Sequence, residues 1–172
     1  MENLKTQTSK KYFSSLAIIH IALTLSPFFL LGFLMFFTIS EPLSPEDVET
    51  DSLDIFQYIV PLIILINIVL NFTFIQNKIG ECRKKTDIIS KMSSYRTILI
   101  MRYAMLEGPA LFSFVVYFLT QNMMYIYIGI IPFIFLVMWR PTRDTAIKDL
   151  QLNGDEIELI RNPEAIIAEV ID

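Results

Sequence analysis

Four long apolar stretches constrain this chain more than any other feature of its sequence. A stretch of about 17 to 25 apolar residues is long enough to cross the hydrocarbon core of a bilayer as a helix. The four stretches cover residues 13–38, 55–75, 98–120 and 123–139. The composition agrees, because 53% of the residues are hydrophobic and only 19% are charged, outside the range of an ordinary soluble domain. The sequence therefore predicts an all-α, polytopic membrane protein with four transmembrane helices.

The remaining polar segments leave room for one folded domain and a tail. We expect a four-helix transmembrane domain over residues 1–140 and an acidic cytoplasmic tail over residues 141–172, which holds eight acids and three bases. Within the tail, Asn162-Pro163 is typical of a helix N-cap followed by the first helical residue. The tail is therefore predicted to form short helices, the last of them over residues 164–171.

The charged residues fall into blocks that predict an orientation. Residues 41–54 carry six acids and no base, whereas residues 77–96 carry six bases and two acids. By the positive-inside rule, the basic segment is cytoplasmic. Lys5, Lys10 and Lys11 place the N-terminus on the same side, and an even number of spans returns the C-terminus there.

The basic segment has two interpretations. Such clusters usually do no more than set the topology of a membrane protein, but they also bind anionic lipids or a partner. The sequence favours the first interpretation and leaves the second open.

Residue counts and missing motifs exclude most classes of enzyme. A single cysteine, Cys82, forms no intrachain disulfide, and a single histidine, His20, leaves no Cys/His set for zinc. The sequence has no Walker loop, no GxGxxG motif and no Ser/His/Asp set that water reaches. We therefore expect no enzyme activity, no cofactor, no metal and no nucleic-acid partner.

Each predicted span contains one proline, namely Pro27, Pro61, Pro109 and Pro132. A proline in a helix interior removes one hydrogen-bond donor and bends the helix, so we expect four bends. Aligning Pro27 with Pro109, and Pro61 with Pro132, also brings similar apolar sequences together. The pattern is compatible with two tandem duplicated hairpins.

One acid, Glu107, lies inside the third apolar stretch, between Met105 and Phe112. An ionisable residue at that depth is costly and marks a functional site by default. Pro109 frees the carbonyl of Met105 within one turn of the acid, and a freed carbonyl beside a carboxyl can form a proton or cation site.

Three further polar residues are predicted to lie near this acid. At about 1.5 Å per residue, His20, Asn67 and Glu107 lie about 13 to 16 Å from the basic or polar residues that end their spans, and so share a layer near mid-membrane. Asn71 lies one turn from Asn67 on the same helix face. Without a partner Glu107 would be mostly neutral and able to exchange a proton, whereas a charged His20 would hold it ionised as a fixed pair. The predicted ion-binding residues are Glu107, His20, Asn67 and Asn71.

The run from Glu107 to Val116 is similar to the ion-carrying helix of the proteolipid, or c, subunits of V-type ATPases. In that family a glutamate is followed four residues on by an aliphatic, an aromatic and a small residue, the order found in Leu111-Phe112-Ser113. This resemblance implies proton or cation transport, although the first stretch holds only Gly32 where that family is glycine-rich. Over its full length the chain resembles small uncharacterised four-helix inner-membrane proteins of bacteria, which implies that location.

Two functions remain open. In the first, which we favour slightly, the chain is a proteolipid-like protein that binds or relays protons, or another cation, at Glu107 and forms homo-oligomers. In the second, it is a non-catalytic membrane scaffold or accessory subunit that contacts a membrane-protein partner. Both functions place it in the lipid bilayer.

Overall fold

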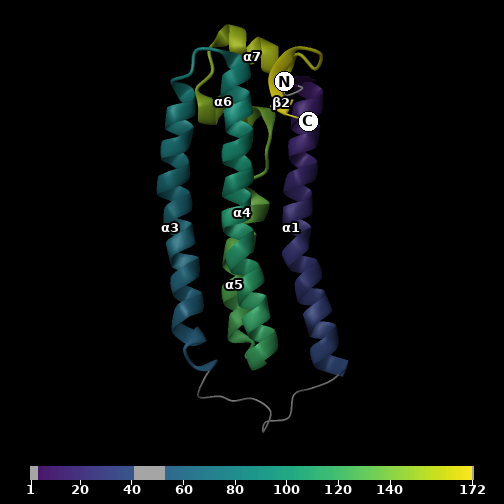
Figure 1. Cartoon of the computed structure of the whole chain (residues 1–172), viewed down its shortest axis with the longest axis vertical. Helices are drawn as coiled ribbons and strands as arrows, with labels where there is room; N and C mark the ends of the chain where they lie inside the picture. The colour runs from purple at the N-terminus through teal and green to yellow at the C-terminus, as the bar shows by residue number, and fades with distance from the viewer. Residues whose placement is uncertain (1–3, 41–52, 172) are drawn as a thin grey trace. The chain divides into compact units, whose positions relative to one another are not determined.

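The computed structural model describes residues 4–40 and 53–171, which form helices and one small sheet joined by short connections (Figure 1). The elements are β1 (Leu4–Thr8), α1 (Ser9–Ser40), α3 (Phe56–Arg83), α4 (Ile88–Thr120), α5 (Met124–Met138), α6 (Arg143–Leu150), α7 (Gly154–Arg161) and β2 (Ile166–Ile171). The predicted helical class is therefore confirmed. The acidic connection at 41–54 lies outside the described residues except for its last two positions.

Three helices, α1, α3 and α4, are long and apolar enough to cross a membrane. Helix α5 has 15 residues, and at about 22 Å it is shorter than the hydrocarbon core of about 30 Å. It passes the same test only together with α6, to which it is bent by 91°. The described residues thus contain three membrane-length helices, or four if the bent pair is one span. The membrane character is confirmed in this form, while the number four stays a prediction.

All four prolines lie inside helices that continue on both sides of them. Helices α1 and α4 also begin before the apolar stretches that predicted them, at Ser9 and Ile88. The polar first turns of these two helices pack within a folded unit. This packing extends each helix beyond its apolar stretch. The predicted bends and the duplication of the hairpins stay predictions.

The chain divides into two compact units. Unit 1 consists of Met1–Ile21, Phe72–Arg102 and Arg140–Asp172, and unit 2 of Ala22–Asn71 and Tyr103–Trp139. This division does not locate a membrane. The predicted transmembrane domain and separate tail therefore stay predictions.

In unit 1, β1 pairs with β2 in an antiparallel sheet, with Gln7 opposite Ala168. The helix predicted over residues 164–171 is therefore wrong, because β2 occupies most of that range. Its Ile and Val residues favour a strand, and β1 supplies the partner that the sequence pattern did not reveal. Asn162 does not cap a following helix, since its side chain instead accepts a hydrogen bond from the Glu164 backbone N–H at 3.1 Å.

The two short helices of unit 1 have clear end signals. Thr142 caps α6 by accepting a hydrogen bond from the Thr145 N–H at 3.1 Å, and Gln151 ends this helix in a left-handed conformation with φ 50°. Asn153 and Glu156 form a capping box at the start of α7. Side-chain oxygens here satisfy backbone donors that the first helical turn leaves free.

Unit 2 is held together by apolar packing. One cluster of buried residues joins α3, α4 and α5 and consists of Val60, Ile64, Val116, Tyr117, Tyr125 and Ile126. A smaller cluster joins Leu34 of α1 to Ala110 and Phe114 of α4. Helix α5 approaches α4 closely at Gly129, where an added Cβ would lie 2.7 Å from Cε1 of Phe114.

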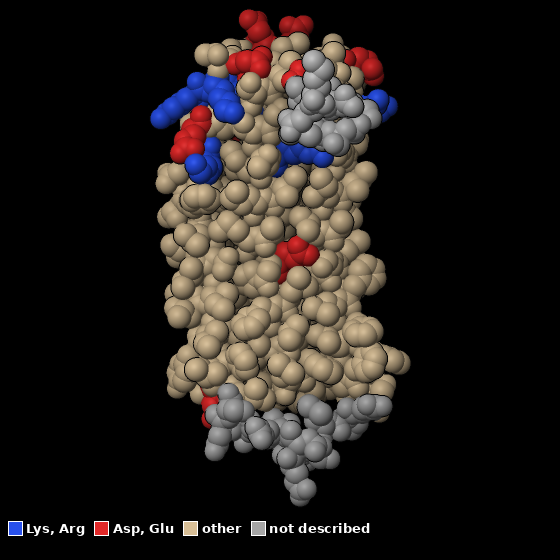
Figure 2. All heavy atoms as spheres, viewed as in Figure 1, with Lys and Arg blue, Asp and Glu red and all other residues tan. Residues whose placement is uncertain are grey.

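The surface of unit 2 is strongly apolar. Phe28, Phe29, Phe36 and Leu65 are between 59% and 67% exposed. On the face shown in Figure 2, a broad tan area carries very few Lys, Arg, Asp or Glu side chains. Most of the charged side chains visible on this face lie outside that area. A soluble monomer rarely exposes so large an apolar area, so this surface is suited to contact lipid.

Candidate functional site

Glu107, the centre of the predicted ion site, lies on α4 in unit 2 and is half-buried. Within the described part of the chain, its carboxylate forms no hydrogen bond or ion pair. Asn67 instead donates from Nδ2 to the Ile63 carbonyl of its own helix at 2.9 Å. Asn71, one turn further along α3, is fully buried. Glu107, Asn67 and Asn71 thus belong to one unit, and among the described residues neither asparagine is hydrogen-bonded to the Glu107 carboxylate.

His20, the fourth predicted residue, lies on α1 and belongs to unit 1. It is buried, with 6% of its surface exposed. Its predicted grouping with Asn67 and Glu107 joins residues of different units and stays a prediction.

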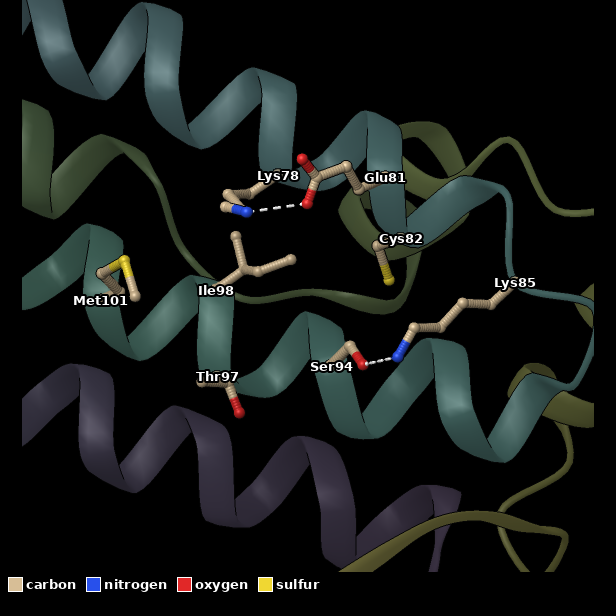
Figure 3. Close-up of a pocket in the computed structure, with 8 residues that line it drawn as sticks. All are labelled: Lys78, Glu81, Cys82, Lys85, Ser94, Thr97, Ile98 and Met101. Atoms are coloured by element: carbon tan, nitrogen blue, oxygen red, sulfur yellow. Dashed lines mark hydrogen bonds and ion pairs between the residues drawn. The ribbon is translucent and has the colours of Figure 1, made fainter.

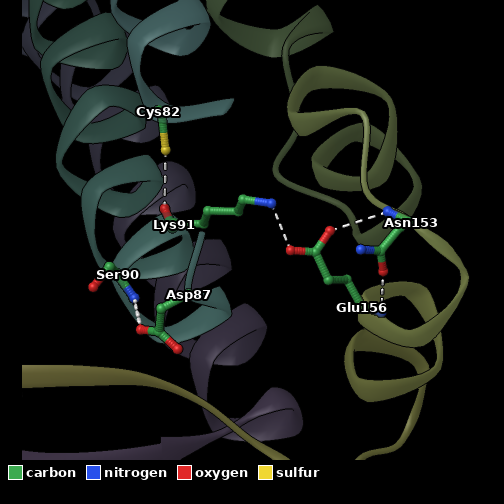
Figure 4. Close-up of polar contacts among 6 residues, drawn as sticks. All are labelled: Cys82, Asp87, Ser90, Lys91, Asn153 and Glu156. Atoms are coloured by element: carbon green, nitrogen blue, oxygen red, sulfur yellow. Dashed lines mark hydrogen bonds and ion pairs between the residues drawn. The ribbon is translucent and has the colours of Figure 1, made fainter. Parts of the chain in front are cut away.

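The most completely formed polar site lies in unit 1, between Lys91 of α4 and Glu156 of α7 (Figure 4). Nζ of Lys91 lies 2.5 Å from Oε1 of Glu156, and each side chain is only 10% exposed. The other carboxylate oxygen of Glu156 accepts a hydrogen bond from the Asn153 N–H at 3.0 Å. The thiol of Cys82 donates to the backbone carbonyl of Lys91 at 3.1 Å. Four residues from three segments of the chain therefore form one connected group.

The electrostatics of this group favour the ionised form of Glu156. Burial alone would raise the pKa of its carboxyl, but the hydrogen bonds from Lys91 and Asn153 and the charge of Lys91 lower the pKa below the ordinary value of 4.5. The ion pair is therefore present at neutral pH. Because a buried charge that loses its partner is costly, removal of either side chain should weaken the contact between α7 and α4.

Further hydrogen bonds attach the N-terminal segment to the same unit. The Tyr12 hydroxyl donates to the Met92 carbonyl at 2.7 Å, and Ser9 Oγ donates to the Ile160 carbonyl at 2.5 Å. Both bonds are buried and join residues far apart in the sequence. They fix the start of α1 against α4 and α7.

The tail is attached by a second set of hydrogen bonds. The Tyr95 hydroxyl donates to a carboxylate oxygen of Asp149 at 2.8 Å, and Nε of Arg83 donates to the Asp149 carbonyl at 2.5 Å. Ser93 Oγ donates to the Glu169 carbonyl and accepts from its N–H, at 3.0 and 3.1 Å. Three segments that are separate in sequence are thus joined through side chains.

These contacts hold the unit together. Among the described residues, no group of three His, Cys, Asp or Glu side chains is placed to hold a metal ion. The polar groups described above bond to one another and to the backbone. Their arrangement can fix the positions of three chain segments.

Lys91 and Glu156 are not among the residues predicted from the sequence. The spacing of Asn153 and Glu156 is that of an N-cap and its third helical residue, so the capping role of Glu156 has a local signal. The partnership with Lys91 has none, because the two residues are 65 positions apart.

Comparison of the chain with protein-family models, curated proteins and solved structures gives no match. The class of protein therefore comes from the helices, whose length and apolar character are compatible with an integral membrane protein.

Proposed function

We propose that this chain is an integral membrane protein that serves as a non-catalytic scaffold or accessory subunit. In this proposal unit 1, which we call the head, carries the contacts with a partner, and the apolar helices hold the chain in the membrane. The observation that carries this proposal is the buried pair of Lys91 and Glu156. Together with the neighbouring hydrogen bonds, it joins three chain segments in one unit. A head fixed in this way offers a partner a single, defined surface.

The proposed location is the bacterial inner membrane, with both termini in the cytoplasm. Unit 1 gathers the N-terminal segment, the basic segment at 77–96 and the tail, which supports placing all three on one side of the membrane. The excess of basic residues favours the cytoplasmic side. The resemblance to small inner-membrane proteins of bacteria points the same way.

The proposed partner is another membrane protein or a second copy of the chain. Chemical cross-linking of the full chain in native membranes tests this. Glu156→Gln is the variant that should disturb unit 1, and Glu158→Gln is the matched control. Glu158 is exposed on the same helix. We expect a discrete cross-linked product for the wild type and Glu158→Gln, and a weaker one for Glu156→Gln. A monomer alone in all three membranes would contradict the proposal.

A second candidate function is the binding of protons, or of another cation, at Glu107. It is supported by the half-buried position of this carboxyl inside an apolar helix and by the similarity of the surrounding run to V-type proteolipid subunits. In this function Glu107 is the group that binds the ion, and the chain acts as a homo-oligomer.

Ion flux separates the two functions. The purified chain and its Glu107→Gln variant are placed in liposomes and assayed for proton and sodium flux, with Glu158→Gln as control. A scaffold leaves all three at the background of protein-free liposomes. Flux that exceeds this background, and disappears only in Glu107→Gln, establishes ion handling and contradicts a purely structural role.

A further inference from the structure

A cavity of about 320 Å³ lies in unit 1 between the end of α3 and the first half of α4. Lys78 of α3 and Lys85 of the following connection line one side, and Ser94 and Met101 of α4 line the other (Figure 3). The scaffold function does not use this cavity. Its lining combines charged, hydroxyl and apolar groups.

Regular spacing along both segments creates the cavity. Residues 78, 81, 82 and 85 recur at intervals of three and four, and residues 94, 97, 98 and 101 repeat the same pattern. Within α3 and α4, positions with this spacing lie on one face of the helix, and Lys85 follows just after the end of α3. One face of each segment therefore lines the space between them.

The polar end of the cavity is cationic. At this end Lys85 donates a hydrogen bond to Ser94 Oγ. Lys78 lies apart from both, beside Ile98, with its Nζ 2.8 Å from Oε2 of Glu81 (Figure 3). Two ammonium groups and one carboxylate leave a net positive charge at the lining. Each ammonium carries three N–H donors, and the Ser94 hydroxyl keeps its own hydrogen for donation. This end can therefore bind an anion with several acceptor oxygens.

The other end of the cavity is apolar. Ile98 and Met101 are its lining residues there, and both lie at the start of the stretch at 98–120 that is predicted to enter the membrane. The distance along α4 from Ser94 to Met101 is about 10 Å. The lining therefore becomes more apolar from Ser94 towards Met101, with the ammonium of Lys78 beside Ile98 between them (Figure 3).

We infer that this cavity binds an anionic phospholipid. Lys85 and Ser94 hold its phosphate group, and Lys78 adds positive charge farther along the cavity, beside Ile98 (Figure 3). Ile98 and Met101 contact the beginning of its acyl chains. A free phosphate ion would use only the polar end, so the apolar end favours the lipid as the source of the phosphate. Basic pockets between helices on the cytoplasmic side of a membrane commonly bind such headgroups.

The test uses native mass spectrometry to measure binding of phosphatidylglycerol to the full chain purified in detergent. Binding of phosphatidylcholine, a neutral lipid, is measured as the reference. We expect the double variant Lys78→Gln/Lys85→Gln to bind phosphatidylglycerol about 30-fold more weakly, since each lysine near an anionic headgroup contributes about one factor of five. Binding of phosphatidylcholine should not change.

Two control variants make the result specific. Lys10→Gln/Lys148→Gln removes the same charge from exposed positions of unit 1 outside the lining, and it should bind within about threefold of the wild type. Lys78→Arg/Lys85→Arg keeps the charge and should retain binding. Equal losses in both glutamine variants would overturn the site, because they would show a general effect of surface charge.

A competition arm distinguishes the sources of the phosphate. Inorganic phosphate and glycerol 3-phosphate are added to the complex with phosphatidylglycerol, and neither should displace it at millimolar concentration. Displacement by these soluble anions would overturn the assignment to a lipid and identify a free phosphate as the ligand. The inference depends on the chain being in a membrane but not on its scaffold role, so cross-linking and lipid binding can fail independently.

Discussion

Nζ of Lys91 lies 2.5 Å from Oε1 of Glu156 in a nearly solvent-free part of unit 1. The pair joins α4 to the short helix α7 across 65 positions of sequence. Removal of one partner from a buried pair leaves the other charge uncompensated, which costs far more than the loss of a surface pair. The position of α7 therefore depends on this contact.

Glu156→Gln should destabilise α7 and its contacts by about 3 kcal/mol. Glutamine at this helix position still completes the capping box, so the substitution removes mainly the charge. Hydrogen exchange of the α7 amides, followed by mass spectrometry, should become about 100-fold faster. Glu158→Gln is the control, and equal protection of α7 in both variants would refute this role of the pair.

Acid should weaken the same contact. The folded-state pKa of Glu156 is below its ordinary value of 4.5, so the stability it contributes is present above 4.5 and is lost as the pH falls through the lower folded value. Thermal unfolding measured from about pH 7 to about pH 3 should therefore show a larger loss for the wild type than for Glu156→Gln. Parallel curves for the two proteins would contradict this.

Gly129→Ala should destabilise unit 2 by about 1 to 3 kcal/mol. The new methyl group would lie 2.7 Å from the Phe114 ring and 3.0 Å from Cβ of Ser113, so α4 and α5 must separate. Gly32→Ala is the matched control, because no atom lies within 4 Å of an added Cβ there, and its better helix propensity should stabilise by up to about 1 kcal/mol. The stability of both variants is measured as the fraction of protein that remains monodisperse in detergent after heating. A Gly129→Ala variant as stable as Gly32→Ala would mean that the close approach is absent.

Tyr12→Phe should cost about 1 to 2 kcal/mol, because the buried Met92 carbonyl loses the hydroxyl donor 2.7 Å away. Tyr58→Phe, at a side chain that is 72% exposed, should change stability by less than about 0.5 kcal/mol. Thermal unfolding of both variants in the same detergent measures the difference. The hydrogen bond has no structural importance if the two variants unfold alike.

Single cysteines should report the sidedness of unit 1. In a Cys82→Ser background, Lys10→Cys, Lys84→Cys and Lys148→Cys should all react with a membrane-impermeant maleimide from one side only, the cytoplasmic side. Asn122→Cys, in the turn between α4 and α5, should react from the opposite side. Labelling of the three lysine positions from different sides would contradict both the predicted topology and the gathering of these segments in unit 1.

The membrane character of the chain was predictable because it depends on local composition. Long runs of apolar residues, such as 55–75, form helices wherever backbone groups must be satisfied without water. The fourth stretch was less predictable, since α5 ends at Met138 and α6 continues only after a sharp bend. The sequence predicted a helix where the structure has β2, at 166–171. Local residues did not reveal this strand, because β2 forms only where β1 provides its partner.

The candidate sites also divide into those that local sequence reveals and those that depend on contacts between distant residues. Glu107 stands out in the sequence because an acid is rare in an apolar stretch, and nothing beyond its own helix is needed to notice it. The basic segment at 77–96 has a local pattern but does not show which of its lysines line a cavity, and the pair of Lys91 with Glu156 has no local pattern. The cavity and the pair arise from contacts between helices.

The order of amino acids alone determined that this chain has membrane-length helices, where its charges gather and which acid lies among apolar residues, since each of these depends on neighbours within a few turns. Only the tertiary structure decided that the start of α1, the end of α3, the start of α4 and the tail form one unit. It also decided that Glu156 meets Lys91 and that a cationic cavity opens onto apolar residues. These contacts join residues tens of positions apart, and burial, not local propensity, selects them.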